Sequence, residues 1–263
     1  MKRGQDAEEQ QEMLLEYLMQ PQNWAKYSYA LNNPLKHTDP TGMRPPTKNE
    51  QDALNRLDQL AGQEGDTDLG NGLRAARAEI AKAIDALGKG QQDVGINVAV
   101  NAILNIGNTN FSEQGSVTIG TANGGITIGF GPGTSNKCNV FVAGAYADGA
   151  GLDFVKNGGS RRGYPLVGGK PPAANWLGDS RDTQKLTNLG IVTDGSLRPG
   201  DIVAWRNDDA PRFGHSSIHI GGNVLVYAGG SPDGTPQART LNFVDNRMGG
   251  HQPYVVRRYN GKP

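Results

Sequence analysis

The spacing of apolar residues changes once along this chain, near Gly107, and that change restricts the folds it can adopt. Before it, residues 54–61 and 73–87 place apolar side chains three and four positions apart, the period of amphipathic helices. After it, residues 116–120 and 125–129 alternate apolar and polar positions around a short Asn-Gly turn, which predicts a β-hairpin. We therefore expect an α+β protein that is helical first and rich in strands afterwards.

Later segments continue the β pattern. We expect a helix that starts near Cys138 and packs on an antiparallel sheet. The stretch 158–197 is rich in glycine and proline and is expected to be a long loop, either functional or disordered. The expected strands of the sheet are residues 201–205, 216–220, 223–227, 238–243 and 254–259.

Composition excludes several classes of protein. The 263 residues carry 26 basic and 26 acidic side chains, a formal net charge of +0, which argues against a nucleic-acid binder. There is no apolar run long enough for a membrane-spanning helix. With 38 glycines and a hydrophobic fraction of 36%, we expect one modest core surrounded by long polar loops.

The single cysteine, Cys138, lies in the string NKCNVFV at the predicted start of a helix. A helix N-terminus lowers the pKa of a thiol, and a nearby imidazole can complete its activation. His215 stands at the head of a later predicted hairpin and would be the base. The backbone amide of Cys138 would serve as an oxyanion donor. The alternative is that Cys138 is an inert, buried apolar side chain.

Two other chemistries are not expected. The histidines and the one thiol lack the short paired spacings of a zinc site, so we expect no metal and no cofactor. The glycine-rich segment 129–133 lacks the Lys-Ser/Thr ending of a phosphate-binding loop.

A resemblance to a known family rests on three strings: NKCN at 136–139, RPGDIVAW at 198–205 and GHSSIHIG at 214–221. Over roughly residues 129–230 the chain resembles the NlpC-like and CHAP-like papain-fold cysteine peptidases. The resemblance implies a papain-like domain in which the cysteine begins a helix that packs on an antiparallel sheet. It also implies that Cys138 is the nucleophile and His215 the base.

The third catalytic position departs from that family. Peptidoglycan peptidases of this kind carry a polar group, often histidine, on the next strand, and here the position falls on Tyr227. A tyrosine hydroxyl orients an imidazole less strongly than a carboxylate does, and Tyr227 could equally be a core aromatic. Asn136, Trp176 and His219 are the candidates for contact with substrate. Trp176 could instead be a core side chain, and His219 a half-exposed strand residue.

The first forty or so residues carry a second resemblance. The string WAKYSYALNNPLKHTDPTG at 24–42 is similar to the end of an RHS (YD-repeat) core, which in that family closes the shell around a C-terminal toxin. We therefore expect an RHS remnant at 1–44, a helical spacer at 45–106 and a papain-like hydrolase at 107–263. The partial motif suggests a fragment or an orphan module of a longer protein.

Together, the two resemblances imply the effector of a polymorphic toxin system that cleaves amide bonds, with bacterial peptidoglycan as the favoured substrate. Its expected partners are a cognate immunity protein and the RHS shell or secretion apparatus. The start of the chain lacks the apolar stretch of a signal peptide, so we expect export by a specialised route and action in the periplasm of a target cell, or in its cytoplasm. The alternatives are a glutamine deamidase or transglutaminase with a cytosolic protein substrate, and a non-catalytic binding domain.

Overall fold

The structure is a computed structural model, and it describes residues 43–88, 90–112, 114–119, 126–130, 137–151, 186–192, 195–206, 214–229, 233–248 and 254–259. The expected helix at 8–19 and the RHS-like string lie outside these residues, so both stay predictions. From Pro45 onward the described residues belong to one compact unit.

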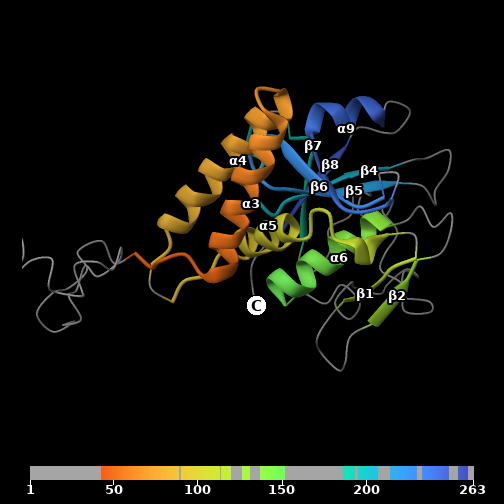
Figure 1. Cartoon of the computed structure of the whole chain (residues 1–263), viewed down its shortest axis with the longest axis horizontal. Helices are drawn as coiled ribbons and strands as arrows, with labels where there is room; N and C mark the ends of the chain where they lie inside the picture. The colour runs from red at the N-terminus through yellow and green to blue at the C-terminus, as the bar shows by residue number, and fades with distance from the viewer. Residues whose placement is uncertain are drawn as a thin grey trace, which may run out of the picture. The chain divides into compact units, whose positions relative to one another are not determined.

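The described helices and strands follow the expected change of period. Helices come first, then a hairpin, a further helix and the strands of a sheet (Figure 1). The elements are α3 (Lys48–Glu64), α4 (Asp68–Asp85), α5 (Val94–Leu104), the 3₁₀ turn η1 (Thr109–Phe111), β1 (Ser116–Ile119), β2 (Ile126–Gly129), α6 (Lys137–Ala150), β3 (Leu186–Gly190), β4 (Ile202–Trp205), β5 (His215–His219), β6 (Val224–Tyr227), β7 (Gln237–Thr240), α9 (Leu241–Arg247) and β8 (Val255–Tyr259).

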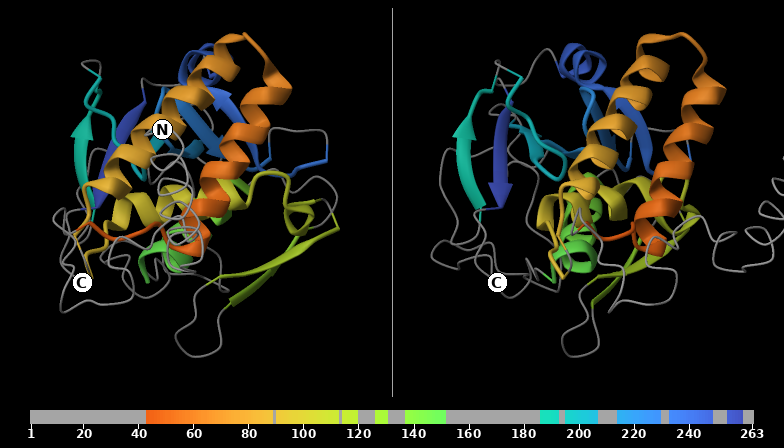
Figure 2. Two further views of the ribbon diagram at one scale, coloured as in Figure 1. Left: turned by 60° about the vertical axis from the view of Figure 1, so that its left-hand side comes forward. Right: turned by 90° about the vertical axis from the view of Figure 1, so that its left-hand side faces the viewer.

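The first three helices of the described residues begin where side chains can cap them. The Thr47 hydroxyl accepts the Glu50 amide, and the Glu50 carboxylate accepts the Thr47 amide at 2.7 Å, so α3 starts with a capping box. Thr67 and Asp93 cap α4 and α5 in the same way with one bond each. Figure 2 shows α3 and α4, in orange, as a pair of helices packed side by side. The expectation of helices in this part of the chain is confirmed.

The described strands form two antiparallel sheets. One is the expected hairpin of β1 and β2, and the other has the order β3-β8-β4-β5-β6-β7. Strand β3 lies inside the stretch 158–197 that was expected to be a loop, so that expectation is wrong for its C-terminal part. The expected strand at 238–243 is also wrong in its second half. The Thr240 hydroxyl accepts the Phe243 amide and caps α9 there.

Helices cover both faces of the larger sheet. In Figure 1 α6 lies below strands β4 to β6, and α9 lies above them. Two apolar clusters match these faces, since Ile218 packs in the cluster that contains α6, whereas Trp205 and Tyr227 pack in the one that contains α9. Leu57 of α3 and Ile80 of α4 belong to the first cluster as well. The coarse α+β class is thus confirmed, and the three-part domain division stays a prediction.

In the described part of the chain, no helix combines the length and the apolar character that crossing a membrane requires.

Candidate active site

Helix α6 begins at Lys137 and carries Cys138 against strand β5. Cys138 is only 4% exposed. Its thiol lies beside the amide and hydroxyl of Ser216, and beside the first-turn amides of Cys138 itself and Asn139. Ser216 directly follows His215 on β5. The helix therefore brings the candidate nucleophile against Ser216. Because side chains alternate between faces along a strand, the adjacent His215 is turned to the opposite face, where its ring contacts Trp205 and Tyr227 of the cluster that contains α9.

Burial raises the pKa of the Cys138 thiol above its ordinary value. The Ser216 amide and hydroxyl and the two first-turn amides act in the opposite direction, and they only partly offset the loss of water. The Ser216 hydroxyl makes no hydrogen bond of good geometry in the described residues. The helix end lowers this pKa as expected, but burial outweighs it, so the net shift of the pKa is upward and at neutral pH the thiol keeps its proton.

His215 is the first residue of β5 and is 9% exposed. Its ring meets the ring of Tyr227 edge-on, with centroids 4.5 Å apart, and lies 5.7 Å from Trp205. The residue at the family's third position is thus in direct contact with the candidate base. Burial raises the pKa of Tyr227, so its hydroxyl keeps its proton. The described contacts contain no hydrogen bond between the Cys138 thiol and the His215 ring, as is common before substrate binds.

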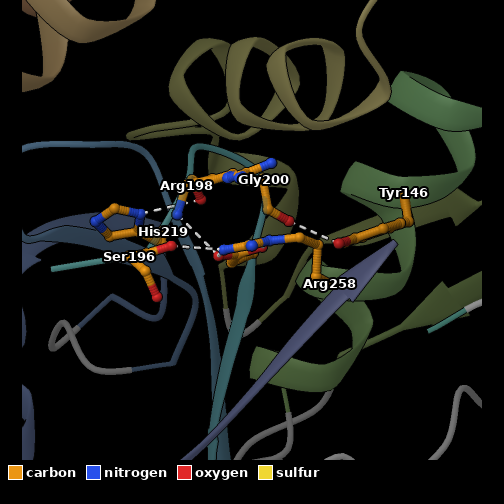
Figure 3. Close-up of polar contacts among 7 residues, drawn as sticks. Tyr146, Ser196, Arg198, Gly200, His219 and Arg258 are labelled. Atoms are coloured by element: carbon orange, nitrogen blue, oxygen red, sulfur yellow. Dashed lines mark hydrogen bonds and ion pairs between the residues drawn. The ribbon is translucent and has the colours of Figure 1, made fainter. Parts of the chain in front are cut away.

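His219, also expected to contact the substrate, points to the turn at Arg198 instead. It is 2% exposed, and its Nδ1 donates a hydrogen bond of 3.1 Å to the carbonyl of Arg198 (Figure 3). Burial lowers the pKa of His219, so the ring is neutral near pH 7. It is not half-exposed, and it is held within the fold near the far end of α6.

Around that C-terminal end of α6, charged and polar side chains are paired with one another. The Tyr146 hydroxyl donates to the Gly200 carbonyl at 2.6 Å, and the Arg258 guanidinium makes two bonds, of 2.8 and 2.7 Å, to the Asp201 carboxylate (Figure 3). The same carboxylate accepts the amide of Arg198. The Pro-Gly-Asp string thus has a structural role here: its aspartate closes its own turn and anchors strand β8.

A cleft of about 960 Å³ opens beside this network. Its walls come from the start of α5, the end of α6, residues 198–201 and the end of β8, and neither Cys138 nor His215 lines it. The cleft and the thiol therefore lie at opposite ends of α6.

Lys137 is a feature of the site that the sequence did not indicate. It is 2% exposed, and its ammonium lies 5.3 Å from the centre of the Phe130 ring. The ammonium also lies against Gly234, in the loop that follows β6. A cation over an aromatic ring gains about 0.5–2 kcal/mol, whereas burying a charge costs several. Lys137 has no carboxylate within ion-pair distance and makes no side-chain hydrogen bond in the described residues.

Two other expected contacts, Asn136 and Trp176, lie outside the described residues and stay predictions. Among the residues that the structure describes, no cluster of histidine, cysteine and acidic side chains could hold a metal ion.

Comparison with known proteins leaves the chain without a family. No protein-family model matches it, and no curated protein matches it significantly in sequence.

Proposed function

We propose that this chain is the effector of an RHS polymorphic toxin system, and that residues 107–263 form a papain-like cysteine hydrolase of the NlpC or CHAP type that cleaves amide bonds in bacterial peptidoglycan. One observation carries the proposal: the chain's only cysteine lies in the first turn of α6 and contacts Ser216 of β5, the residue that directly follows His215. The three strings quoted above support the choice of family, and the RHS-like string supports the toxin context.

The reaction divides into two steps. Because burial keeps the thiol of Cys138 protonated, His215 removes that proton as the sulfur attacks the amide carbonyl, rather than beforehand. A C–S bond forms, the C–N bond breaks, and the imidazolium gives its proton to the leaving amine. Water then attacks the thioester with His215 as base, releasing a carboxylic acid and restoring the thiol.

Backbone groups around the thiol suit the charge that develops during attack. The amides of Cys138 and Asn139 belong to the first turn of α6, and the Ser216 amide of β5 also contacts the sulfur. Free backbone amides at a helix N-terminus can donate hydrogen bonds to an oxyanion and stabilise it. Tyr227 would position the imidazole through its ring contact, since the two rings are nearly perpendicular with centroids 4.5 Å apart.

Burial of the thiol favours a second candidate, a glutamine deamidase or transglutaminase. A residue that is 4% exposed suits a narrow slot for a single side chain better than an open groove for a peptidoglycan strand. The Cys138–His215 chemistry would be the same, with ammonia as the leaving group and a cytosolic protein as the substrate. Either activity would require a cognate immunity protein in the producing cell.

Expression in bacteria separates these candidates. The full chain should be used, because helices α3 and α4 contribute to the same apolar cluster as α6. It would be expressed in the cytoplasm or directed to the periplasm, as wild type, as Cys138→Ala and as His215→Ala. We expect lysis from the periplasm alone, abolished by either substitution. Tyr227→Phe should retain most of the activity, because it keeps the ring that contacts His215.

The other outcomes are equally informative. Cysteine-dependent toxicity confined to the cytoplasm would favour the deamidase or transglutaminase. If neither compartment shows an effect that depends on Cys138, although the variants are expressed and folded equally, the chain would be a non-catalytic binding domain.

A further inference from the structure

The hydroxyl of Ser216 is a buried polar group that makes no hydrogen bond of good geometry within the described part of the chain. Ser216 has an exposed fraction of 0% and lies on the face of β5 that packs against α6. A hydroxyl in such a place has lost its bonds to water, and folded proteins ordinarily replace them. Ser216 therefore costs stability that an alanine of nearly the same size would not cost, and a role in function explains why a serine stands there.

The next residue on the strand provides an internal comparison. Ser217 also has an exposed fraction of 0%, but its hydroxyl donates a hydrogen bond of 3.1 Å to the carbonyl of Val203. The fold thus provides a partner for one of two adjacent buried serines and not for the other. The difference lies in what the two hydroxyls face, because that of Ser216 lies beside the thiol of Cys138.

Other donors converge on the same place. The amide of Ser216 comes from β5, the amides of Cys138 and Asn139 come from the first turn of α6, and all three contact the sulfur of Cys138. A neutral thiol is a weak hydrogen-bond acceptor, so it makes poor use of these donors. When the sulfur attacks a carbonyl, the carbonyl oxygen lies close to the sulfur and gains negative charge, which such donors bind strongly.

We propose that Ser216 is a catalytic residue, whose hydroxyl donates a hydrogen bond to the carbonyl oxygen of the amide that Cys138 attacks. The proposal rests on the proposed function for the reaction, and it adds a side-chain donor to the backbone amides of Cys138 and Asn139. Because no other bond of good geometry holds this hydroxyl among the described residues, it can turn to the oxygen as charge develops without first breaking one.

Two small reagents distinguish this role from an effect on the thiol itself. p-Nitrophenyl acetate acetylates a cysteine through an oxyanion: the C–S bond forms, the C–O bond breaks, nitrophenolate leaves and the thiol proton passes to solvent. Methyl methanethiosulfonate instead forms a disulfide and releases methanesulfinate, so no carbonyl oxygen takes part. With Cys138→Ala as the blank, we expect Ser216→Ala to slow acetylation of Cys138 by about a hundredfold and to change the disulfide reaction by less than about twofold. Ser217→Ala is the matched control and should change neither rate.

Each other outcome has a definite meaning. If Ser216→Ala slows both reactions equally, the hydroxyl acts on the thiol and not on a carbonyl oxygen, and the proposal is refuted. An unchanged rate of acetylation refutes it as well. A wild-type Cys138 that the ester does not acetylate would contradict the proposed hydrolase itself, and the role of Ser216 with it.

Thermal stability gives a readout that is independent of reactivity. Ser216→Ala removes a buried hydroxyl that lacks a good hydrogen bond, so its Tm should equal or exceed that of the wild type. Ser217→Ala removes a hydroxyl that is bonded to the Val203 carbonyl, so its Tm should fall. A loss of Tm in Ser216→Ala as large as that in Ser217→Ala, or a failure of Ser216→Ala to fold, would show that the hydroxyl is structural and would overturn the proposal.

Discussion

The two ends of helix α6 differ in how their polar groups are paired. At the C-terminal end, Tyr146, Asp201 and Arg258 hold one another and the turn at Gly200 through short hydrogen bonds. At the N-terminal end, Lys137 has no carboxylate within ion-pair distance in the described part of the chain, and burial keeps the Cys138 thiol neutral. Native proteins pair nearly all of their buried polar groups. The comparison indicates that polar pairing stabilises the C-terminal end of the helix more than its N-terminal end.

The strongest test of this contrast replaces one glycine near each end of α6 with alanine. Gly200 (φ +90°) and Gly234 (φ +78°) both have backbone angles that disfavour other residues. A Cβ at Gly200 would overlap the backbone of Gly95, which cannot move aside, whereas one at Gly234 would overlap the flexible end of Lys137 and come within 3.2 Å of the Phe111 carbonyl oxygen. We expect Gly200→Ala to lower the free energy of unfolding by more than about 3 kcal/mol and Gly234→Ala by about 1–2. Urea denaturation measures both, and equal losses would remove the contrast.

Asp201→Asn should have the next largest effect. It removes the charge that pairs with Arg258 while leaving a similar shape, and Asp201 is 2% exposed. Breaking a fully buried ion pair costs about 3–5 kcal/mol, and we expect about 2–3 here because the Arg258 side chain is 24% exposed. Chemical denaturation at neutral pH checks this. A change below about 0.5 kcal/mol would show that the network is not structural.

Tyr146→Phe removes one hydroxyl from the same network. The lost bond to the Gly200 carbonyl is buried, so we expect a destabilisation of about 1–1.5 kcal/mol with the packing of the ring unchanged. Thermal unfolding of Tyr146→Phe beside the wild type measures the loss, and a destabilisation below about 0.5 kcal/mol would contradict the assignment.

Substitution of His219 is expected to have the smallest effect on stability. This residue is an exception at the well-paired C-terminal end of α6, since its Nε2 is buried without a hydrogen bond in the described part of the chain. Burial lowers its pKa in the folded state, so below the ordinary histidine value of about 6.5 the unfolded chain binds a proton that the folded chain does not. Stability should therefore fall as the pH drops from 6.5, by up to about 1 kcal/mol per pH unit. Glu79, Asp201 and Arg258 also act on this ring. His219→Gln should flatten the profile, and an unchanged slope would assign the pH dependence to other groups.

Much of the fold follows from local sequence. Helices α3 to α5 follow from spacing and from caps such as Thr47 and Asp93, which act within one turn. Residues 241–243 were expected to extend a strand because their apolar residues alternate. They begin helix α9 instead, and the Thr240 side chain caps that helix by accepting the Phe243 amide. Strand β3 was missed because its partner, β8, lies some seventy residues later and no local pattern reports such a pairing.

The candidate site was predictable only in part. The family resemblance placed Tyr227 at the third catalytic position, and its ring contacts that of His215, although the role of Tyr227 in catalysis stays a prediction. Sequence could not show that Cys138 is buried deeply enough to raise its pKa, because burial depends on distant strands. Lys137 was missed for the same reason, since a lysine at a helix start is ordinarily solvent-exposed.

The position of β8 has a consequence for the order in which the molecule can form. This strand comes last among those described, yet it lies inside the sheet, between β3 and β4. During synthesis, β3 emerges early and must wait for β8 before its backbone groups can pair. The sheet therefore cannot be completed on the ribosome until β8 itself has been made and has entered between β3 and β4.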